Sequence, residues 1–307
     1  MREVKDLKAQ DLNRLWNIFV GIRKEIPYNS DLEKAYFKYY MPLNAFRIWK
    51  ILKKVNFFKK ELRVLDLGTG SLSAILGIYL SNGWIKEIHA VDKGNYGKIG
   101  RKYIQKLLGK EIPITFFFSG IEEYLLIEKN KFKPNLVVLS YVLNEINMSD
   151  FNLLKVTLQL IELLTRDGLL IIVEPAMQEA SSRVQKIKTW LNMYSNNLLN
   201  IDMKKRSVVT LGKSWYYWEV NYKRSRNIKI IDKNLDIKRN ILRFSLLCVE
   251  KEENISRRQT SVLSGLMYSD GVFRKYLSTK FGKISISQDE SSFISNFVDT
   301  YRGDYLF

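Results

Sequence analysis

The pattern of apolar and polar positions changes at about residue 61. From there, short and continuous apolar runs alternate with longer stretches of helical spacing. The runs are 63–67, 87–91, 112–118, 136–140 and 169–174, and the helical stretches between them are 72–81, 98–108, 121–128 and 152–164. Buried parallel strands read as continuous apolar runs, and strand–helix alternation places helices on both faces of the sheet. The pattern therefore predicts an α/β fold with a mostly parallel sheet.

The flanking segments have other patterns. Residues 1–60 show helical spacing, with Asp31 as a candidate cap and Pro42 as a point where the helix breaks or restarts. After the alternating region we expect a basic helix at 182–194, a strand at 243–249 and a small β unit within 262–286. We therefore expect a helical N-terminal cap (1–60), a central α/β domain (61–250) and a small β-rich C-terminal unit (251–307).

The composition excludes several classes of site. The chain has one cysteine, Cys248, and one histidine, His89, which excludes an internal disulfide, a His-based catalytic dyad and a Cys- or His-rich metal site. We expect His89 to pack beside the sheet and Cys248 to be buried. The apolar runs are far shorter than a membrane span, and the N-terminus lacks the pattern of a signal or transit peptide. We expect a soluble, cytoplasmic protein with no metal and no membrane partner; the sequence does not indicate its oligomeric state.

The net charge of +18 is unevenly distributed. Residues 1–60 hold 14 basic and 6 acidic residues, and residues 201–250 hold 12 and 5, whereas residues 61–200 hold 16 and 14. Basic surfaces of this size attract polyanions. A general lysine bias is the alternative explanation, but it would not leave the centre nearly neutral. We therefore expect both basic segments to contribute to one surface that binds nucleic acid.

The most specific local signal is the segment from Val64 to Ser71, which closes a strand and opens a helix. Its centre reads Asp66-Leu67-Gly68-Thr69-Gly70. Glycines allow a tight turn and the close approach of a ligand, and a helix N-terminus favours negatively charged groups. The dinucleotide fingerprint needs a third glycine where this chain has Ser73, so that fingerprint fails.

The acidic residue before the glycines resembles motif I of the class I S-adenosylmethionine-dependent methyltransferases. In that family the strand-end acid, here Asp66, reaches the methionyl ammonium, and the usual third glycine is here Leu72. A second strand-end acid, Asp92, can accept both ribose hydroxyls. The resemblance implies further contacts to the cofactor from residues that follow the third and fourth strands: Ser119, Gly120, Ile121 and Ser140.

Several segments together resemble the methyltransferase-like proteins of mitochondrial small-ribosomal-subunit assembly and their bacterial relatives. The segments are Ala35-Tyr36 with Met41-Pro42, Ser140 to Ile146, Leu170 to Ala176, Phe244 to Leu247, and Arg302 to Leu306. The resemblance implies a class I methyltransferase fold, S-adenosylmethionine as cofactor, and small-subunit ribosomal RNA or an assembling ribosomal particle as partner. Many members carry a cysteine cluster that this chain lacks, so no metal is implied.

The methyl acceptor stays open at this point. Asn144, Glu145 and Glu174 are candidates to orient or deprotonate it. The aromatic and basic segment 213–226 is either the edge of a β-hairpin or an RNA contact in which Trp215 and Trp218 stack on bases. One alternative function is a ribosome-assembly factor that binds the cofactor without transferring a methyl group, and another is a small-molecule methyltransferase.

Overall fold

The computed structural model describes most of the centre of the chain. The described residues are 35–128, 131–143, 145–146, 148–194, 204–210, 213–224, 228–229, 232–233, 240–251, 261–262, 267–269, 272–279 and 282–287. The expected cap Asp31, the candidate Asn144 and the closing motif at 302–306 lie outside them.

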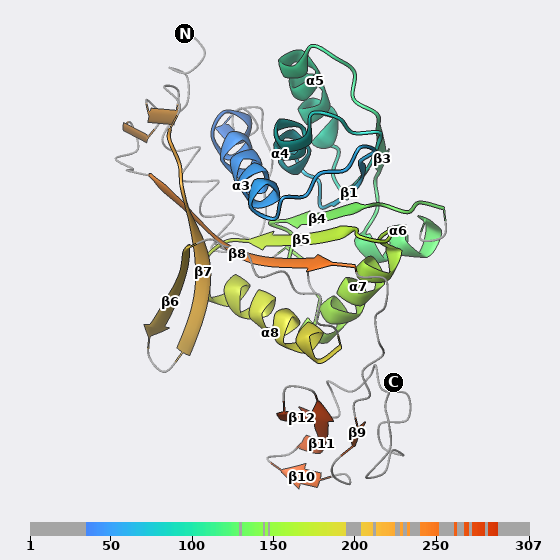
Figure 1. The fold of residues 1–307 in the computed structure, drawn as a ribbon, viewed down its shortest axis with the longest axis vertical. Helices are drawn as coiled ribbons and strands as arrows, with labels where there is room; N and C mark the ends of the chain where they lie inside the picture. The colour runs from blue at the N-terminus through green and yellow to red at the C-terminus, as the bar shows by residue number, and fades with distance from the viewer. Residues whose placement is uncertain are drawn as a thin grey trace.

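The fold is organised around an eight-stranded sheet (Figure 1). Five parallel strands come first: β1 (Arg63–Leu67), β2 (Glu87–Val91), β3 (Ile114–Phe117), β4 (Leu136–Ser140) and β5 (Leu169–Glu174). Three antiparallel strands extend it: β8 (Ile241–Glu250), β7 (Lys213–Asn221) and β6 (Lys204–Thr210). The strand order is β3-β2-β1-β4-β5-β8-β7-β6. Along the sheet, the chain first adds strands on one side of β1 and then, from β4 onward, on its other side, as in doubly wound Rossmann-like sheets. The predicted α/β fold with a mostly parallel, Rossmann-like sheet is confirmed.

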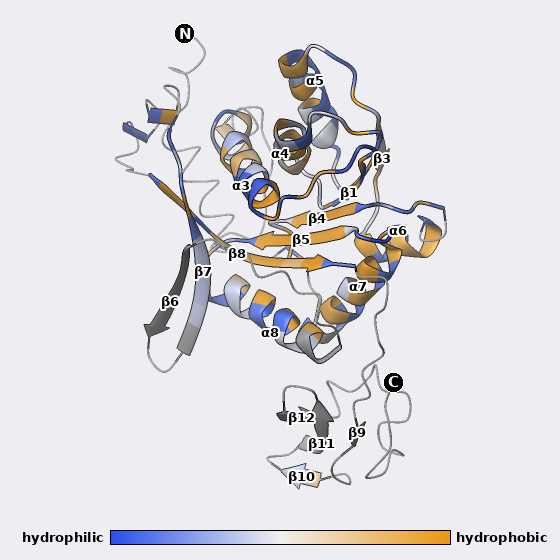
Figure 2. Ribbon diagram, viewed as in Figure 1, coloured by the Kyte–Doolittle hydropathy of each residue, from blue (hydrophilic) through white to orange (hydrophobic). Residues whose placement is uncertain are grey.

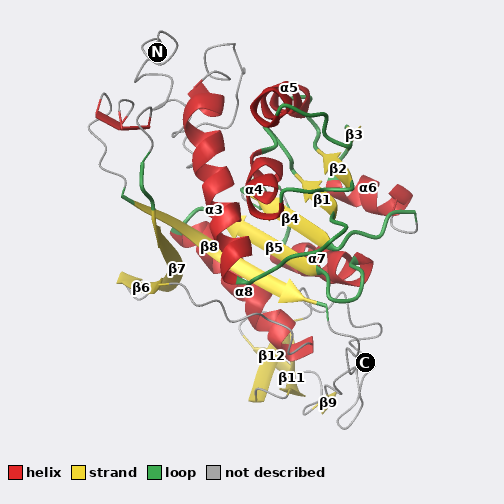
Figure 3. Ribbon diagram, turned by 45° about the horizontal axis from the view of Figure 1, so that its top comes forward, coloured by secondary structure: helices red, strands yellow, loops and turns green. Residues whose placement is uncertain are grey.

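Helices cover both faces of the sheet (Figures 1 and 3). One face carries α3 (Met41–Lys54), α4 (Ser73–Asn82) and α5 (Gly97–Leu108), and the other carries α6 (Ile121–Glu128), α7 (Asp150–Leu163) and α8 (Gln178–Tyr194). The central strands are apolar along their length (Figure 2) because successive side chains enter different cores: Val138 packs on the α3 side, and Val137 and Leu139 pack on the α7 side.

The described part of the N-terminal cap, from residue 35 onward, packs on α4 and shares a core with one face of the sheet. A π-helix (η2, Tyr36–Tyr40) leads directly into α3, and Pro42 lies in the first turn of α3, where its missing N–H is tolerated. A Cβ at Gly77 of α4 would lie 2.4 Å from the Ala45 carbonyl oxygen, so glycine allows α3 and α4 to approach this closely. The two helices are therefore held in one position relative to the sheet.

The C-terminal part contains a second sheet. Its strands are β9 (Ser261–Val262), β10 (Met267–Ser269), β11 (Val272–Thr279) and β12 (Gly282–Ser287), and all of their pairings are antiparallel. Among the described residues, no helix is both long enough and apolar enough to cross a membrane.

Candidate functional site

The candidate site lies at the carboxyl ends of the parallel strands, where β1 and β4 lie side by side and the strand order reverses. Ligands of open α/β sheets bind in the crevice outside these strand ends. Asp66 lies near the end of β1, Asp92 follows β2, Ser119 follows β3, and Ser140 ends β4. The topology therefore brings together the predicted cofactor residues from four strands.

Asp66 is buried beneath the glycine turn. It is 1% exposed, and its Oδ2 accepts a hydrogen bond from the Thr69 hydroxyl at 2.5 Å. Burial, together with the nearby negative charge of Asp92, raises the pKa of Asp66 to about 7, although the Thr69 bond acts in the opposite direction. A cation placed beside this carboxyl would favour its ionised form.

Asp92 fixes the same turn from the next strand. Its Oδ2 accepts the Gly70 N–H at 2.8 Å, and its Oδ1 accepts the Gly94 N–H at 2.8 Å. The Gly68 N–H bonds to the Val91 carbonyl at 2.8 Å, which ties the turn to β2. A carboxylate offers about four lone-pair positions, so Asp92 keeps acceptor capacity for a ligand's hydroxyl groups.

The two glycines of the turn have different roles. Both have positive φ, +67° at Gly68 and +47° at Gly70. A Cβ at Gly68 would lie 2.2 Å from Cγ2 of Val142, so this glycine makes room for the protein's own side chain and not for a ligand. A Cβ at Gly70 would meet nothing closer than the Gly68 oxygen at 3.9 Å. The space available to a ligand therefore lies on the Gly70 side.

Leu72 occupies the position of the usual third glycine in a left-handed conformation. Its φ is +64°, a region that glycine adopts without strain, and its side chain is fully buried. The sequence departs from the glycine pattern while the backbone keeps the shape that a glycine would adopt. Burial of the leucine side chain offsets the local strain.

Glu174, at the end of β5, holds the loop that follows β4. Its Oε1 accepts the N–H groups of Val142 at 2.9 Å and Leu143 at 2.8 Å. Burial raises the pKa of Glu174 to about 8, the two backbone bonds lower it in part, and the Glu145 charge raises it further. Its Oε2 is buried without a hydrogen-bond partner, as is the Ser140 hydroxyl. Glu174 thus positions the loop through direct backbone contacts.

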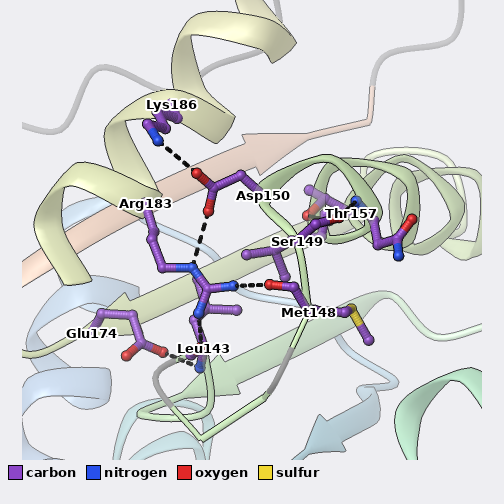
Figure 4. A network of polar contacts seen from close by, with 10 residues as sticks. Leu143, Met148, Ser149, Asp150, Thr157, Glu174, Arg183 and Lys186 are labelled. Carbon is purple, nitrogen blue, oxygen red and sulfur yellow. Dashed lines mark hydrogen bonds and ion pairs between the residues drawn. The ribbon is translucent and has the colours of Figure 1, made fainter. Parts of the chain in front are cut away.

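Arg183 of α8 clamps the same loop by binding its backbone carbonyl groups (Figure 4). Its guanidinium donates to the carbonyl oxygens of Leu143 and Met148, the latter at 2.8 Å. It also forms an ion pair with Asp150 at 3.2 Å, and Asp150 pairs with Lys186 at 2.7 Å. The basic helix at 182–194 was predicted, but this clamp was not, because a carbonyl-binding arginine has no distinguishing sequence pattern.

Glu145 lies in the clamped loop, and its side chain is exposed. Desolvation, and secondarily the negative charge of Asp92, raise the pKa of Glu145 above its usual value. Ser119 and Gly120 are partly exposed, and Ile121 begins α6. Asp66, Asp92 and Glu145 thus place three carboxyl groups near the strand ends.

The single histidine and the single cysteine belong to the core, as predicted. The His89 ring stacks on Phe132 at 3.7 Å, and its Nδ1 lies 2.7 Å from the Tyr124 hydroxyl. Cys248 is 2% exposed, and burial raises the pKa of its thiol. Within the described part of the chain, no group of three or more His, Cys, Asp or Glu residues is arranged to hold a metal ion.

Described residues of the two basic segments contact each other near the end of β7. The ring of Phe46 in α3 packs on Tyr222, which follows β7, at 4.7 Å. The Tyr39 hydroxyl donates to Asp232 at 2.8 Å, and Arg224 pairs with the same buried carboxylate at 3.1 Å. These contacts join the described parts of the N-terminal cap and of the segment 201–250 through buried or partly buried side chains; a shared basic surface stays a prediction.

The segment 213–226 requires correction. Its described part, 213–224, contains β7, as the hairpin alternative predicted. However, β7 is not an edge strand, because it pairs with β6 on one side and β8 on the other. Trp218 is only 7% exposed and packs in the core, so the prediction that it stacks on RNA bases is wrong. Trp215 is partly exposed. Successive side chains of a strand point to opposite faces, so Trp215 and Trp218, which are three residues apart, lie on different faces.

A scan against protein-family models found no match, and a search of curated proteins found none. Solved structures show a distant similarity. The YcgJ protein from Bacillus subtilis is 15% identical, with 68% of this chain and 99% of that chain covered and a TM-score of 0.41. An rRNA methylase from Streptococcus thermophilus is 12% identical, with 69% of this chain and 96% of that chain covered and a TM-score of 0.38. SMU.1697c from Streptococcus mutans, a putative methyltransferase solved in complex with SAH, is 13% identical, with 68% of this chain and 96% of that chain covered and a TM-score of 0.38. At these values, the similarity carries no information on the ligand or substrate of this chain.

Proposed function

We propose that this protein is an S-adenosylmethionine-dependent methyltransferase that acts on RNA. The observation that carries the proposal is the paired acids, Asp66 and Asp92, that hold a positive-φ glycine turn at the switch point of the sheet. The cofactor carries an ammonium, a sulfonium and two ribose hydroxyls. An acidic pocket with free carboxylate lone pairs complements all of these groups.

Each predicted cofactor residue has a role that its position supports. Asp66 would pair with the ammonium, because a cation relieves the unfavourable burial of its charge. Asp92 would accept the ribose hydroxyls with the lone pairs that Gly70 and Gly94 leave unused. The residues after β3 would border the adenine, and the unpartnered Ser140 hydroxyl offers a further hydrogen bond. When bound, the cofactor supplies a methyl group activated by a positively charged sulfur.

On the acceptor side, Glu145 is the favoured base. It is exposed at the mouth, and its raised pKa places it closer to the range in which a carboxylate accepts a proton efficiently at neutral pH. It would take the proton that the acceptor loses as the acceptor attacks the methyl group. Glu174 would act as a positioning residue, because its carboxyl faces the backbone of the loop that carries Glu145.

The charge distribution supports RNA as the substrate. The two segments that hold the excess of basic residues contact each other through Phe46 and Tyr222. We propose small-subunit ribosomal RNA, or the particle in which it assembles, as the target of a cytoplasmic enzyme. Affinity should then fall steeply with salt, with a logarithmic slope of about −0.7 to −0.9 per neutralised phosphate.

A binding-only assembly factor is the second candidate, and one observation favours it. Of the three acceptor-side candidates, Asn144 lies outside the described residues, and Glu174 binds the backbone of the loop. Glu145 is therefore the remaining described candidate for a base. Such a protein would need an intact cofactor pocket and basic surface but no base.

The test is the transfer of tritiated methyl from the cofactor to small-subunit RNA. We expect wild-type protein to label the RNA, and Glu145→Gln to bind cofactor normally but to transfer about 10²- to 10⁴-fold more slowly. Glu162→Gln, at an exposed position of α7, is the matched control and should transfer at the wild-type rate. Cofactor binding without any labelled RNA would contradict transferase activity and support the binding-only factor.

A further inference from the structure

A groove between three helices lies outside the residues assigned to the cofactor. It has a volume of about 230 Å³ and is open to solvent on one side. Its walls include four aromatic side chains from three parts of the chain: Phe46 and Trp49 of α3, Tyr103 of α5 and Tyr222 after β7. Leu76 and Leu80 of α4 also line it. Tyr103 is 46% exposed and Leu80 is 55% exposed. Large apolar side chains exposed together in a depression indicate a binding surface.

The three helices that form the groove carry charged side chains of one sign. The helices α3, α4 and α5, which form its walls, contain eight lysines and arginines and no aspartate or glutamate: Arg47, Lys50, Lys53, Lys54, Lys98, Arg101, Lys102 and Lys106. The Lys50 ammonium lies 4.7 Å from the ring centre of Trp49 and 5.5 Å from that of Phe46. An occupant that is both aromatic and anionic complements these walls.

We propose that this groove binds an unstacked base of single-stranded RNA, with the adjoining phosphates on the lysines. Aromatic side chains interleaved with lysines are the means by which proteins hold single-stranded nucleic acid, since every base has a face that stacks and every linkage a negative charge. The volume suits a small flat group, because sites for drug-sized ligands measure roughly 300–1,000 Å³. An apolar peptide would leave the one-sided charge without a partner.

The groove is connected to the candidate site through α3. Phe46 lines the groove, and the next residue, Arg47, places its guanidinium 5.6 Å from the ring centre of Tyr141, directly after β4. A strand of RNA seated in the groove would therefore continue toward the loop that carries Glu145. The inference rests on the proposed function only in taking RNA as the substrate; binding in the groove requires no methyl transfer.

The experiment measures the binding of a fluorescein-labelled, single-stranded ten-nucleotide RNA by fluorescence anisotropy over a range of salt concentrations. We expect Trp49→Ala and Tyr103→Ala each to weaken binding about 5- to 100-fold, the range that corresponds to the loss of stacking on one base. The logarithmic salt slope should stay unchanged, because neither substitution removes a phosphate contact. Cofactor binding, measured by calorimetry, should also stay unchanged.

Trp84→Ala is the matched control. Trp84 is 61% exposed and lies 5.8 Å from the Lys110 ammonium, but it does not line the groove. Trp84→Ala should bind the RNA like wild type. Because Trp49 and Tyr103 belong to different helices, a folding defect in one variant leaves the other as a test.

Two outcomes would overturn the inference. One is RNA binding that both groove variants retain in full, which would leave the groove to another occupant, such as a protein. The other is an equal loss in Trp84→Ala, which would show a general effect of exposed aromatic residues. If the RNA binds in the groove but no methyl group is transferred, the proposed activity fails and the groove proposal stands.

Discussion

Glu174 offers the most quantitative test of how the loop after β4 is held. Its Oε1 accepts two backbone N–H groups, while its Oε2 is buried without a partner. Burial raises its pKa from 4.5 to about 8. We consider Glu174→Gln, which keeps an acceptor oxygen for both N–H groups but cannot ionise.

The sign of the effect follows from the raised pKa. Between pH 4.5 and about 8, the folded protein retains a proton on Glu174 that the unfolded chain has lost, so the free energy of unfolding falls as pH rises. Each pH unit in this window costs about 1.4 kcal/mol. From pH 6 to pH 8, wild type should therefore lose about 2–3 kcal/mol relative to the variant, and the difference should level off above pH 8.

The assay is urea unfolding of both proteins at pH 6, 7, 8 and 9. Groups other than Glu174 titrate in both proteins, so the difference between their free energies of unfolding isolates this carboxyl. A difference that stays constant across the range would show that Glu174 ionises normally and would refute its burial as described. Glu174→Ala adds a control: it should cost about 2–5 kcal/mol at every pH, because two buried N–H groups lose their acceptor.

Three further results follow from the site and the cap. Gly68→Ala should destabilise the protein by about 2–5 kcal/mol in urea unfolding, because the new Cβ would lie 2.2 Å from Cγ2 of Val142 and the backbone has a positive φ. Adding Val142→Ala to this variant should recover part of the loss. No recovery would contradict the contact. Tyr39→Phe should cost about 1–3 kcal/mol in thermal unfolding by removing a donor from the buried Asp232, and an unchanged midpoint would count against that bond. Cofactor affinity, measured by calorimetry, should rise from pH 6 to pH 7 and flatten above. At pH 6 most Asp66 carries a proton that must leave before the carboxylate can pair with the ammonium, and less of it does at higher pH. Affinity that is constant over this range would argue against the pairing.

Much of the fold follows from local sequence. Five apolar runs predicted the five parallel strands because strands buried on both faces have no polar alternation, and the strand predicted at 112–118 is only shorter in the structure, at Ile114–Phe117. The pairing of β8 with β5, and of β7 with β8, joins residues far apart in the chain. No local pattern specifies such pairs. The strand at 243–249 was predicted, and a hairpin at 213–226 was one alternative, but their pairing into one sheet with the parallel strands was not predicted.

The site was predictable where backbone geometry demands particular residues. The acid–glycine turn needs positive φ, and the sequence shows this directly at Gly68 and Gly70. The identity of the neighbours is a tertiary property: Val142 fills the space beside Gly68, and Arg183 reaches the Leu143 carbonyl from a helix 40 residues away. Such contacts are fixed by packing and leave no spacing signal in the chain.

The most direct test of the central claim measures whether Asp92 recognises ribose hydroxyls. Calorimetry would compare S-adenosylhomocysteine with its 2′-deoxy analogue on three proteins: wild type, Asp92→Ala, and the exposed control Asp167→Asn. We predict that wild type and the control bind the 2′-deoxy analogue about tenfold or more weakly, the loss of one charge-assisted hydrogen bond of about 1.5–3 kcal/mol, and that Asp92→Ala binds both ligands equally. Equal discrimination by all three proteins, or no binding by wild type, would contradict the account.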